Sequence, residues 1–444
     1  MHSRRWLWAP PALIAILAAV TLGAGRHVEA CAFDPRRPHT YEADQQRQAY
    51  LAAMDAAAVN RLFPGDTFFG LPPVRIGTRS GRADGPAVLP AALLKAIGWV
   101  ESDLTMASRS VAFHAVGDAL VSFDCGHGVM QVTTGMTIPL GDQNRPTDRQ
   151  VRVATHYVSN IARGAWILAD KWNQSPEMRP IAGTDTGGNP QLIENWYFAV
   201  WAYNGFTGPG SSQSNHPLAP SLGWPRPAFR CDGTQARNRY PYQELVWGCL
   251  ANPPSRNQQL LWTPVAAALP DLTQPVFFNA LAPARFQFPY SEMDIPTPQP
   301  ANVAVPPVVA ADFAQRALGS PALSVTGDRS ITLLTRGSPA QSTATVSIRN
   351  AGTGILSWHA TTSDHFLVLS PPAGVAVGGD LSCSGPLCPG GTLAVTVNPT
   401  LLPRARSTGT ITIQSPNATG PPVQINVLVV ADFEVGTPGT SRAR

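Results

Sequence analysis

Three short motifs in this chain carry side chains that could do acid–base chemistry on a bound molecule. Glu101-Ser102 ends an apolar run with helical spacing, and two further motifs follow it, Gly128-Val129-Met130-Gln131 and Ala202-Tyr203-Asn204-Gly205. A carboxyl group among apolar neighbours has a raised pKa and can donate a proton near neutral pH. Glu101, which follows Trp99 and Val100, is therefore the candidate acid.

The second and third motifs supply groups that could contact a substrate. Gly128 would let a ligand approach the backbone closely, and Met130 would form an apolar wall. Gln131 offers both a donor and an acceptor. Tyr203 and Asn204 end an apolar segment. A buried turn around Met130 and an ordinary helix end at Asn204 are the alternative interpretations.

Taken together and in this order, the motifs resemble the three signature motifs of the soluble lytic transglycosylase family. Members of that family have a lysozyme-like fold and cleave peptidoglycan. The resemblance implies that Glu101 acts first as acid and then as base on the β-1,4 bond between N-acetylmuramic acid and N-acetylglucosamine, leaving 1,6-anhydromuramic ends. It also implies that the Tyr203 hydroxyl bonds Glu101 and that further residues bind substrate, namely Ser102, Gly128, Met130, Gln131 and Asn204.

The chain departs from the family pattern at three points. Val129 stands where leucine is usual, Gly205 comes one place early, and the interval from Glu101 to Gly128 is long. These departures concern the local shape of the cleft. Asn160-Ile161, with Gly164 and Leu168, resembles the helix that precedes the third motif, and we expect it to serve packing.

Three alternatives remain open on the sequence. A hydrolytic muramidase or chitinase of the same fold would need a second carboxylate, for which Asp103 and Asp124 are the nearest candidates. A non-catalytic wall-binding protein would use the same groove only to hold glycan. The stretch Phe123-Asp124-Cys125-Gly126 is superficially similar to the nucleophile region of cell-wall cysteine peptidases, but that chemistry needs a free thiolate with a paired histidine.

The elements that must position these groups can be read from periodicity. One helical face is expected after Pro90, formed by Leu93, Ile97, Val100 and Leu104. Further along, Thr147 and Gln150 predict a capping box at the start of a long amphipathic helix. A further helix is expected from Asn189-Pro190 to Asn204, with loops and short helices over 206–262. We therefore predict a mainly α, lysozyme-like catalytic domain at 85–265, preceded by an approach segment at 31–84.

The C-terminal part has a different pattern. Proline is frequent between 281 and 318, which predicts an extended linker. Beyond it, apolar and polar residues alternate over short runs, which predicts an all-β, Ig-like sandwich at 320–432 and a flexible tail at 433–444. The stretch from Ser347 to Gly354, followed by Leu356-Ser357-Trp358, resembles bacterial accessory domains of the BACON type. We expect the two domains to fold independently across a small interface, with Trp358 in the core.

Composition and the N-terminus indicate an exported protein. The 444 residues are 44% hydrophobic and only 14% charged, with a net charge of +4, which is too weak for nucleic-acid binding. Arg4, Arg5 and the apolar run from Leu13 to Leu22 predict a signal peptide over 1–30, with lipidation of Cys31 as a less favoured alternative. We expect a secreted or cell-envelope monomer that binds peptidoglycan glycan strands, has no integral membrane segment after cleavage, and needs no metal or cofactor.

Six cysteines in an exported chain predict disulfides. Sequence proximity favours Cys383 with Cys388 and Cys231 with Cys249, which leaves Cys31 with Cys125. Six cysteines allow many other pairings, so the connectivity stays open at this stage.

Overall fold

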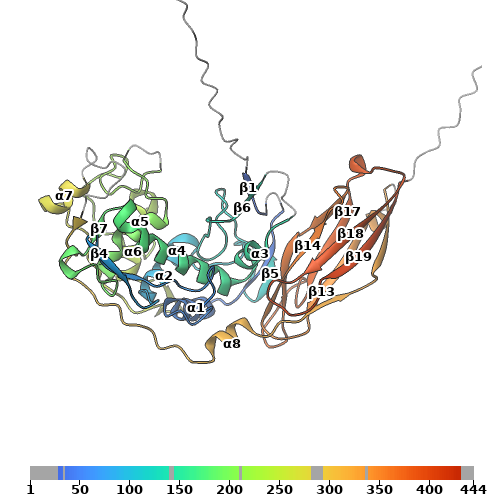
Figure 1. Ribbon diagram of the computed structural model, residues 1–444, viewed down its shortest axis with the longest axis horizontal. Coiled ribbons are helices and arrows are strands. Elements are labelled where there is room, and N and C mark those ends of the chain that lie inside the picture. Colours follow the sequence, from blue (N-terminus) through green and yellow to red (C-terminus); the bar gives the residue numbers. More distant parts are fainter. Residues whose placement is uncertain are drawn as a thin grey trace, which may run out of the picture.

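The computed structural model describes residues 29–33, 36–139, 145–209, 213–281, 294–335 and 339–431. A unit built from helices and short strands lies beside a β-sandwich, and the chain that joins them runs along one side of the first unit (Figure 1). The predicted signal peptide and C-terminal tail lie almost entirely outside the described residues. Among the described helices, none is long and apolar enough to cross a bilayer.

The helices of the first unit enclose one apolar core. α2 (Ala91–Ser102) presents the expected face of Leu93, Ile97 and Val100 to the interior, and it begins directly after Pro90. The remaining helices of this unit are α1 (Gln48–Ala58), α3 (Asp148–Thr155), α4 (Tyr157–Met178), α5 (Tyr197–Tyr203), α6 (Tyr242–Ala251) and α7 (Pro275–Leu281). The capping box of Thr147 and Gln150 is present at α3. The predicted long helix divides into α3 and α4 at His156, whose backbone is extended.

Short strand pairs connect distant parts of this unit. β1 (Glu29–Cys31) pairs with β6 (Thr137–Pro139), β2 (His39–Glu42) with β5 (Ala115–Asp118), and β7 (Ile181–Ala182) with β10 (Asp294–Ile295). Two local hairpins are β3 (Arg75–Thr78) with β4 (Gly81–Asp84), and β8 (Ser255–Arg256) with β9 (Gln259–Leu260). Through β2 and α1, the predicted approach segment is part of the core.

The C-terminal part forms two facing sheets. One has the strand order β11-β13-β17-β15 and the other β12-β19-β18-β14-β16. The bounds are β11 (Leu323–Thr326), β12 (Ser330–Leu334), β13 (Thr343–Asn350), β14 (Ile355–Thr362), β15 (Leu367–Ser370), β16 (Ala373–Val377), β17 (Gly391–Val397), β18 (Arg406–Gln414) and β19 (Val423–Val430), with a single helical turn, α9 (Pro339–Ser342), after β12. Trp358 lies in the core between the sheets, as expected, where Gly374 and Gly391 make room for its indole.

The prediction of a mainly α lysozyme-like domain followed by a separate sandwich is wrong for this molecule. Helix and strand each account for about 26% of the residues that the structure describes, and the strands form several sheets. Helical periodicity identified the helices of the first unit, but its strands are only two to four residues long. Most of them pair with partners far along the chain, and so short a strand has no periodicity to detect. The expectation of a mainly α framework therefore missed the sheets within the first unit.

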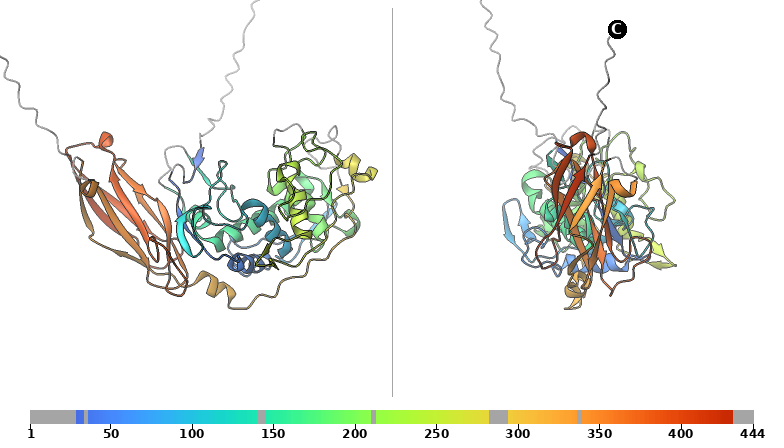
Figure 2. Two further views of the ribbon diagram at one scale, coloured as in Figure 1. Left: turned by 180° about the vertical axis from the view of Figure 1, so that it is seen from behind. Right: turned by 90° about the vertical axis from the view of Figure 1, so that its right-hand side faces the viewer.

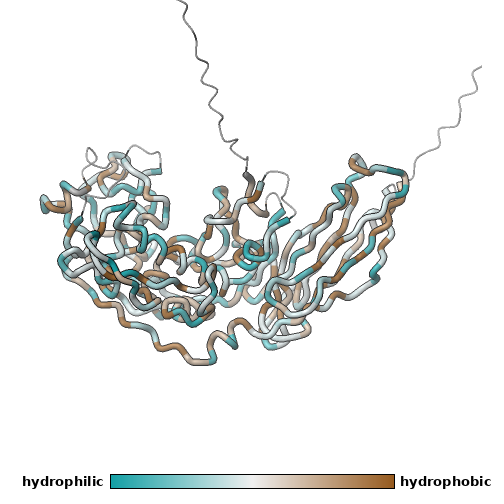
Figure 3. The backbone as a smooth tube through the Cα atoms, viewed as in Figure 1, coloured by the Kyte–Doolittle hydropathy of each residue, from teal (hydrophilic) through white to brown (hydrophobic). Residues whose placement is uncertain are grey.

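The predicted linker is extended but docked for part of its length. Thr297 is buried and donates through its hydroxyl to Asp185, and Asn302 donates through its backbone and its amide to the buried carboxylate of Glu194. After these contacts the chain returns beneath the first unit through α8 (Phe313–Leu318) to the sandwich, as two views show (Figures 1 and 2). Apolar residues recur along this return path (Figure 3).

The two units meet across an interface that contains buried polar and apolar residues. The His359 imidazole donates to the Asp148 carboxylate over 2.9 Å, and the Thr155 hydroxyl donates to the Ser357 hydroxyl over 2.8 Å. Both Ser357 and His359 are buried. Four apolar residues of the sandwich belong to the same core cluster as the helices, namely Ile355, Ala373, Val375 and Val377.

All three favoured disulfides are present, Cys31–Cys125, Cys231–Cys249 and Cys383–Cys388. The Cys31 thiol is therefore not available for lipidation. The third disulfide closes a loop of the sandwich that reaches the first unit, where the Ser384 backbone donates to the His114 carbonyl. Three disulfides are typical of a chain that folds in an oxidising, extracytoplasmic compartment.

Candidate functional site

The end of α2 positions Glu101 and joins it to the second motif. The helix stops because Asp103 and Leu104 both adopt positive φ, at 55° and 54°. At this point the Ser102 hydroxyl contacts the carbonyl oxygens of Gly98 and Val129, the latter over 2.7 Å. Ser102 is buried and does not line the cavity beside Glu101. The structure thus places it as a connection between α2 and the second motif, whereas we had predicted a substrate contact.

Glu101 is half-buried as a residue and lines a cavity of about 650 Å³. Burial, with a smaller contribution from the negative charge of Asp124, raises the pKa of Glu101 to about 7. A hydrogen bond from the Tyr242 hydroxyl, 2.6 Å from Oε1, and the positive charge of Arg237 oppose this rise. The group can therefore exist in both protonation states near neutral pH, as an acid that later becomes a base requires.

The three motifs converge on this cavity. Its lining includes Glu101 from the first motif, Gln131 from the second, and Tyr203 and Asn204 from the third. The wall continues through polar residues of the loops that follow, namely Thr207, Gln213, Ser214, Asn215 and Asn238. Amide and hydroxyl groups predominate, and such a lining suits a ligand rich in hydroxyl and acetamido groups.

Within the second motif, only Gln131 faces the cavity. Its amide donates to the Gly128 carbonyl over 2.8 Å, which closes a tight turn. Gly128 has φ of +64°, and an added Cβ would lie 2.6 Å from the sulfur of Met106 and 2.8 Å from the amide nitrogen of Asn160. Met130 is fully buried, so it packs in the core and forms no cavity wall. Gly128 and Met130 therefore shape the turn that carries Gln131.

Asn160 on α4 holds the same turn from behind. Its side-chain oxygen accepts from the Met130 backbone over 2.9 Å, and its amide donates to the carbonyl oxygens of His127 and Val153. The residue is completely buried. This confirms the packing role expected for Asn160.

In the third motif, the Tyr203 hydroxyl donates to the Met130 carbonyl over 2.8 Å and not to Glu101. Burial, and then the nearby carboxylate of Glu101, raise the pKa of Tyr203 well above its usual value. Asn204 accepts a hydrogen bond from the Asn215 amide over 2.6 Å, so it also orders the loop beside the cavity. The direct Tyr203–Glu101 hydrogen bond that the resemblance implied is absent.

The tyrosine that does bond Glu101 is Tyr242, at the start of α6, and sequence reasoning missed it. Burial, and then the charge of Glu101, raise its pKa far above the usual range, so it remains a hydrogen-bond donor. The available signal was weak, because Pro241 before Tyr242 marks a helix start and gives no indication of which tertiary partner the ring meets.

The two candidate second carboxylates lie in different places. Asp124 lines the same cavity as Glu101. Asp103 lines a neighbouring cavity and contacts the guanidinium groups of Arg109 and Arg237, at 2.9 and 3.6 Å. Of the two, only Asp124 is placed to act on a molecule that also reaches Glu101.

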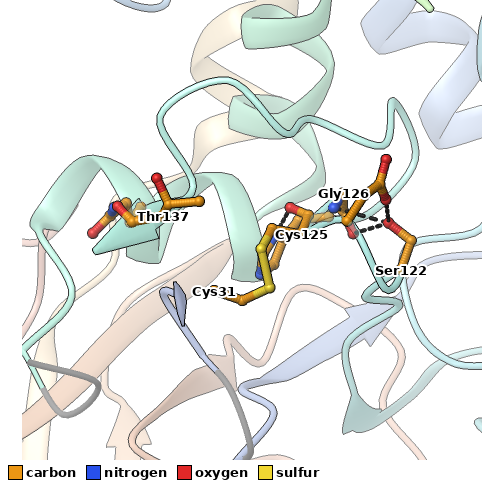
Figure 4. Close-up of a disulfide and its surroundings, with 8 residues drawn as sticks. Cys31, Ser122, Cys125, Gly126 and Thr137 are labelled. Carbon is orange, nitrogen blue, oxygen red and sulfur yellow. Dashed lines mark hydrogen bonds between the residues drawn. A yellow bond between two sulfur atoms is a disulfide. The ribbon is translucent and has the colours of Figure 1, made fainter. Parts of the chain in front are cut away.

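The loop that carries Asp124 is tied down by a disulfide and a local hydrogen-bond network. Cys125 pairs with Cys31, and the Ser122 hydroxyl accepts from the Gly126 backbone (Figure 4). The His127 ring is buried, contacts the Cys125 carbonyl through Nδ1, and has its pKa lowered by burial to about 4. With its thiol in a disulfide, Cys125 is not a nucleophile, so the cysteine peptidase alternative fails.

Comparison with known proteins gives little guidance. No family model matches the chain, and no curated protein matches it. Among solved structures, a Bacteroides ovatus GH5 xyloglucanase in complex with a XXXG heptasaccharide matches with 23% identity and a TM-score of 0.17, over 25% of this chain and 19% of that chain.

Two other solved structures match over a similar share of this chain. The periplasmic chaperone SfaE matches with 13% identity and a TM-score of 0.20, over 27% of this chain and 61% of its own. A Porphyromonas gingivalis W83 protein of unknown function matches with 19% identity and a TM-score of 0.20, over 26% of this chain and 48% of its own. The chain thus spans less than two thirds of each of these structures.

Proposed function

We propose that this protein is a secreted lytic transglycosylase that cleaves peptidoglycan between N-acetylmuramic acid and N-acetylglucosamine. The observation that carries the proposal is the half-buried residue Glu101, with a carboxyl pKa of about 7, at a polar cavity that the second and third motifs also line. A glycosidic bond needs a proton donor of this kind for its leaving oxygen.

The proposed reaction uses one protein carboxyl group twice. Neutral Glu101 donates its proton to the glycosidic oxygen while the bond from the anomeric carbon to that oxygen breaks. The acetamido oxygen of the muramic residue stabilises the anomeric carbon in the meantime. The Glu101 carboxylate then accepts the proton of the muramic 6-hydroxyl, whose oxygen bonds the anomeric carbon, so that the anhydro ring forms without water.

Neighbouring side chains support this cycle in the proposal. The Tyr242 hydroxyl stabilises the carboxylate that forms after proton donation, because it already donates to Oε1. Gln131 and Asn204 present amide groups to the same cavity and would bind acetamido or hydroxyl groups of the glycan.

A hydrolytic muramidase is the second candidate, and Asp124 favours it. A carboxylate that shares the cavity with Glu101 could activate a water, which the transglycosylase reaction does not use. The two candidates share Glu101 as the acid and differ in the chemical end they leave on the muramic residue.

Turnover of purified sacculi by Glu101→Gln tests whether Glu101 is the acid. The amide keeps the shape and the acceptor for Tyr242 but cannot donate the proton, so we expect a rate loss on the order of 10²–10⁴. Glu177→Gln, an exposed change on α4, is the matched control and should leave the rate unchanged.

Near wild-type turnover by Glu101→Gln would refute the assignment of the acid. If the wild-type protein binds sacculi and releases nothing, the non-catalytic alternative holds and the protein binds the wall without cleaving it.

A further inference from the structure

A second cavity, of about 860 Å³, borders on two of the chain segments that line the catalytic cavity, although the two cavities have no lining residue in common. Along the last turn of α2, Glu101 lines the catalytic cavity while Trp99 and Asp103 line the second one. The same division occurs at Arg237 and Asn238, which line the second and the catalytic cavity respectively. A substituent on a substrate bound at Glu101 would reach the second cavity by crossing one of these two segments.

This second cavity is built on rigid elements. Both Cys231 and Cys249 line it, and their disulfide fixes the loop around residue 231 to α6. The β8–β9 hairpin forms another side, with Asn257 and Gln258 at positive φ in its two-residue turn. Such a turn matches the twist of its strands and holds the hairpin in one geometry.

The cavity is cationic, with three arginines, Arg230, Arg237 and Arg256, against two aspartates, Asp103 and Asp232. The ion pairs are loose, at 3.4 Å from Arg230 to Asp232 and 3.6 Å from Arg237 to Asp103. Arginine in this setting recognises carboxylates through paired N–H donors.

Arg256 distinguishes an anionic ligand from a neutral sugar. Its guanidinium lies over the Trp99 ring, 5.5 Å from the centroid, on an exposed part of β8. A sugar could not stack on this face of the Trp99 ring without displacing the guanidinium. The stacked guanidinium is instead oriented for a carboxylate at low entropic cost.

We propose that this second cavity binds the acidic peptide substituent carried by the glycan, with Arg256 and Arg230 receiving its carboxylates. The inference rests on the proposed function, because only a substrate held at Glu101 carries its substituent into this cavity. It adds a specificity site, so that glycan bearing peptide is cleaved in preference to bare glycan.

The test compares Arg256→Ala and Arg230→Ala in the full chain on two substrates, glycan strands with their peptides and the same strands after amidase removal of the peptides. Arg239→Ala is the matched control, since Arg239 lies on the same 3-10 turn as Arg237 (Arg237–Arg239) but lines neither cavity. Loss of one charge-assisted contact should raise KM for peptide-bearing glycan about tenfold and leave kcat unchanged. KM for stripped glycan should not change, and Arg239→Ala should behave as wild type.

An equal effect on both substrates, or no effect on either, overturns the inference. If the wild-type protein cleaves neither substrate, the proposed function fails. Whether the second cavity binds an acidic peptide is then tested by calorimetric titration of Glu101→Gln with a synthetic alanyl-γ-glutamyl-lysyl-alanine peptide. The acidic-peptide site is supported if the protein binds this peptide, and if binding is lost both when the peptide carboxylates are amidated and when the Arg256→Ala substitution is added. No binding of the free peptide overturns it.

Discussion

At the scale of single residues, Glu101 is held between groups that act on its proton in opposite directions. Asp124 raises its pKa by charge repulsion, while Tyr242 lowers it by donating to the carboxylate. Burial is the largest cause and sets the value near 7. Near neutral pH this balance leaves a fraction of the Glu101 carboxyl groups protonated, and a protonated group can ionise during the reaction.

This balance predicts opposite pH shifts for two variants. An acid must carry its proton, so activity should fall as pH rises through about 7. Asp124→Asn removes a charge that raises the pKa of Glu101, so the fall should move to lower pH. Tyr242→Phe removes a hydrogen bond that lowers this pKa, so the fall should move to higher pH. The measurement is kcat/KM against pH on soluble glycan fragments, and shifts in the same direction would contradict this account of the site.

Sequence reasoning reached part of this site. Glu101, Gln131, Tyr203 and Asn204 do line one cavity, as the resemblance of the three motifs implied. Tyr242 was not predictable, since it lies 141 positions from Glu101 and meets it only through the packing of α6 against α2.

At the scale of elements, the hydrogen bonds of Asn160 hold α4 and the second motif together. Its side chain satisfies three backbone groups in a fully buried position. A buried backbone group without a partner is costly, so this single residue fixes the turn that carries Gln131.

Asn160→Leu should therefore destabilise the fold by about 2–4 kcal/mol, because buried groups at His127 and Met130 lose their partner. Urea unfolding followed by circular dichroism measures the change. Asn189→Ala, which loses one exposed hydrogen bond to the Gln191 backbone, is the control and should cost about 1 kcal/mol or less. Equal effects of the two substitutions would argue against a special role for Asn160.

Elements with strong local signals were predicted well and the short ones were not. The α3 capping box and the α2 face follow from local spacing. The break at His156 between α3 and α4 could not be predicted, because neither proline nor glycine stands there in the sequence. Pairs such as β2 with β5 depend on chain segments more than 70 positions apart, which periodicity cannot detect.

At the scale of the whole molecule, the alternating pattern correctly indicated the sandwich but not where it docks. Ile355, Val375 and Val377 face the helical unit and not the interior of the sandwich. Alternation places such residues on one face of a sheet and does not reveal that a second unit covers that face. The docked part of the linker also means that a truncated chain ending near Pro296 would lose Asn302 and leave the buried Glu194 without two of its donors.

Because the units share a core, the full chain should unfold in one calorimetric transition with the disulfides intact. His359→Ala removes one of the two sandwich side chains that donate to Asp148, while Gln414 remains, and should lower the stability of the whole molecule by roughly 1–3 kcal/mol at pH 7. Two resolved transitions, of which His359→Ala shifts the temperature of only one, would contradict this expectation. They would show that the units fold independently, as the linker sequence had suggested.

The central claim concerns the bond that Glu101 breaks and the end that it leaves. Mass analysis of the fragments that the wild-type protein releases from purified sacculi tests it most directly. The account predicts muropeptides that end in 1,6-anhydromuramic acid, with no such products from Glu101→Gln. Fragments with reducing muramic ends would contradict it and identify a hydrolase in which Asp124 activates water.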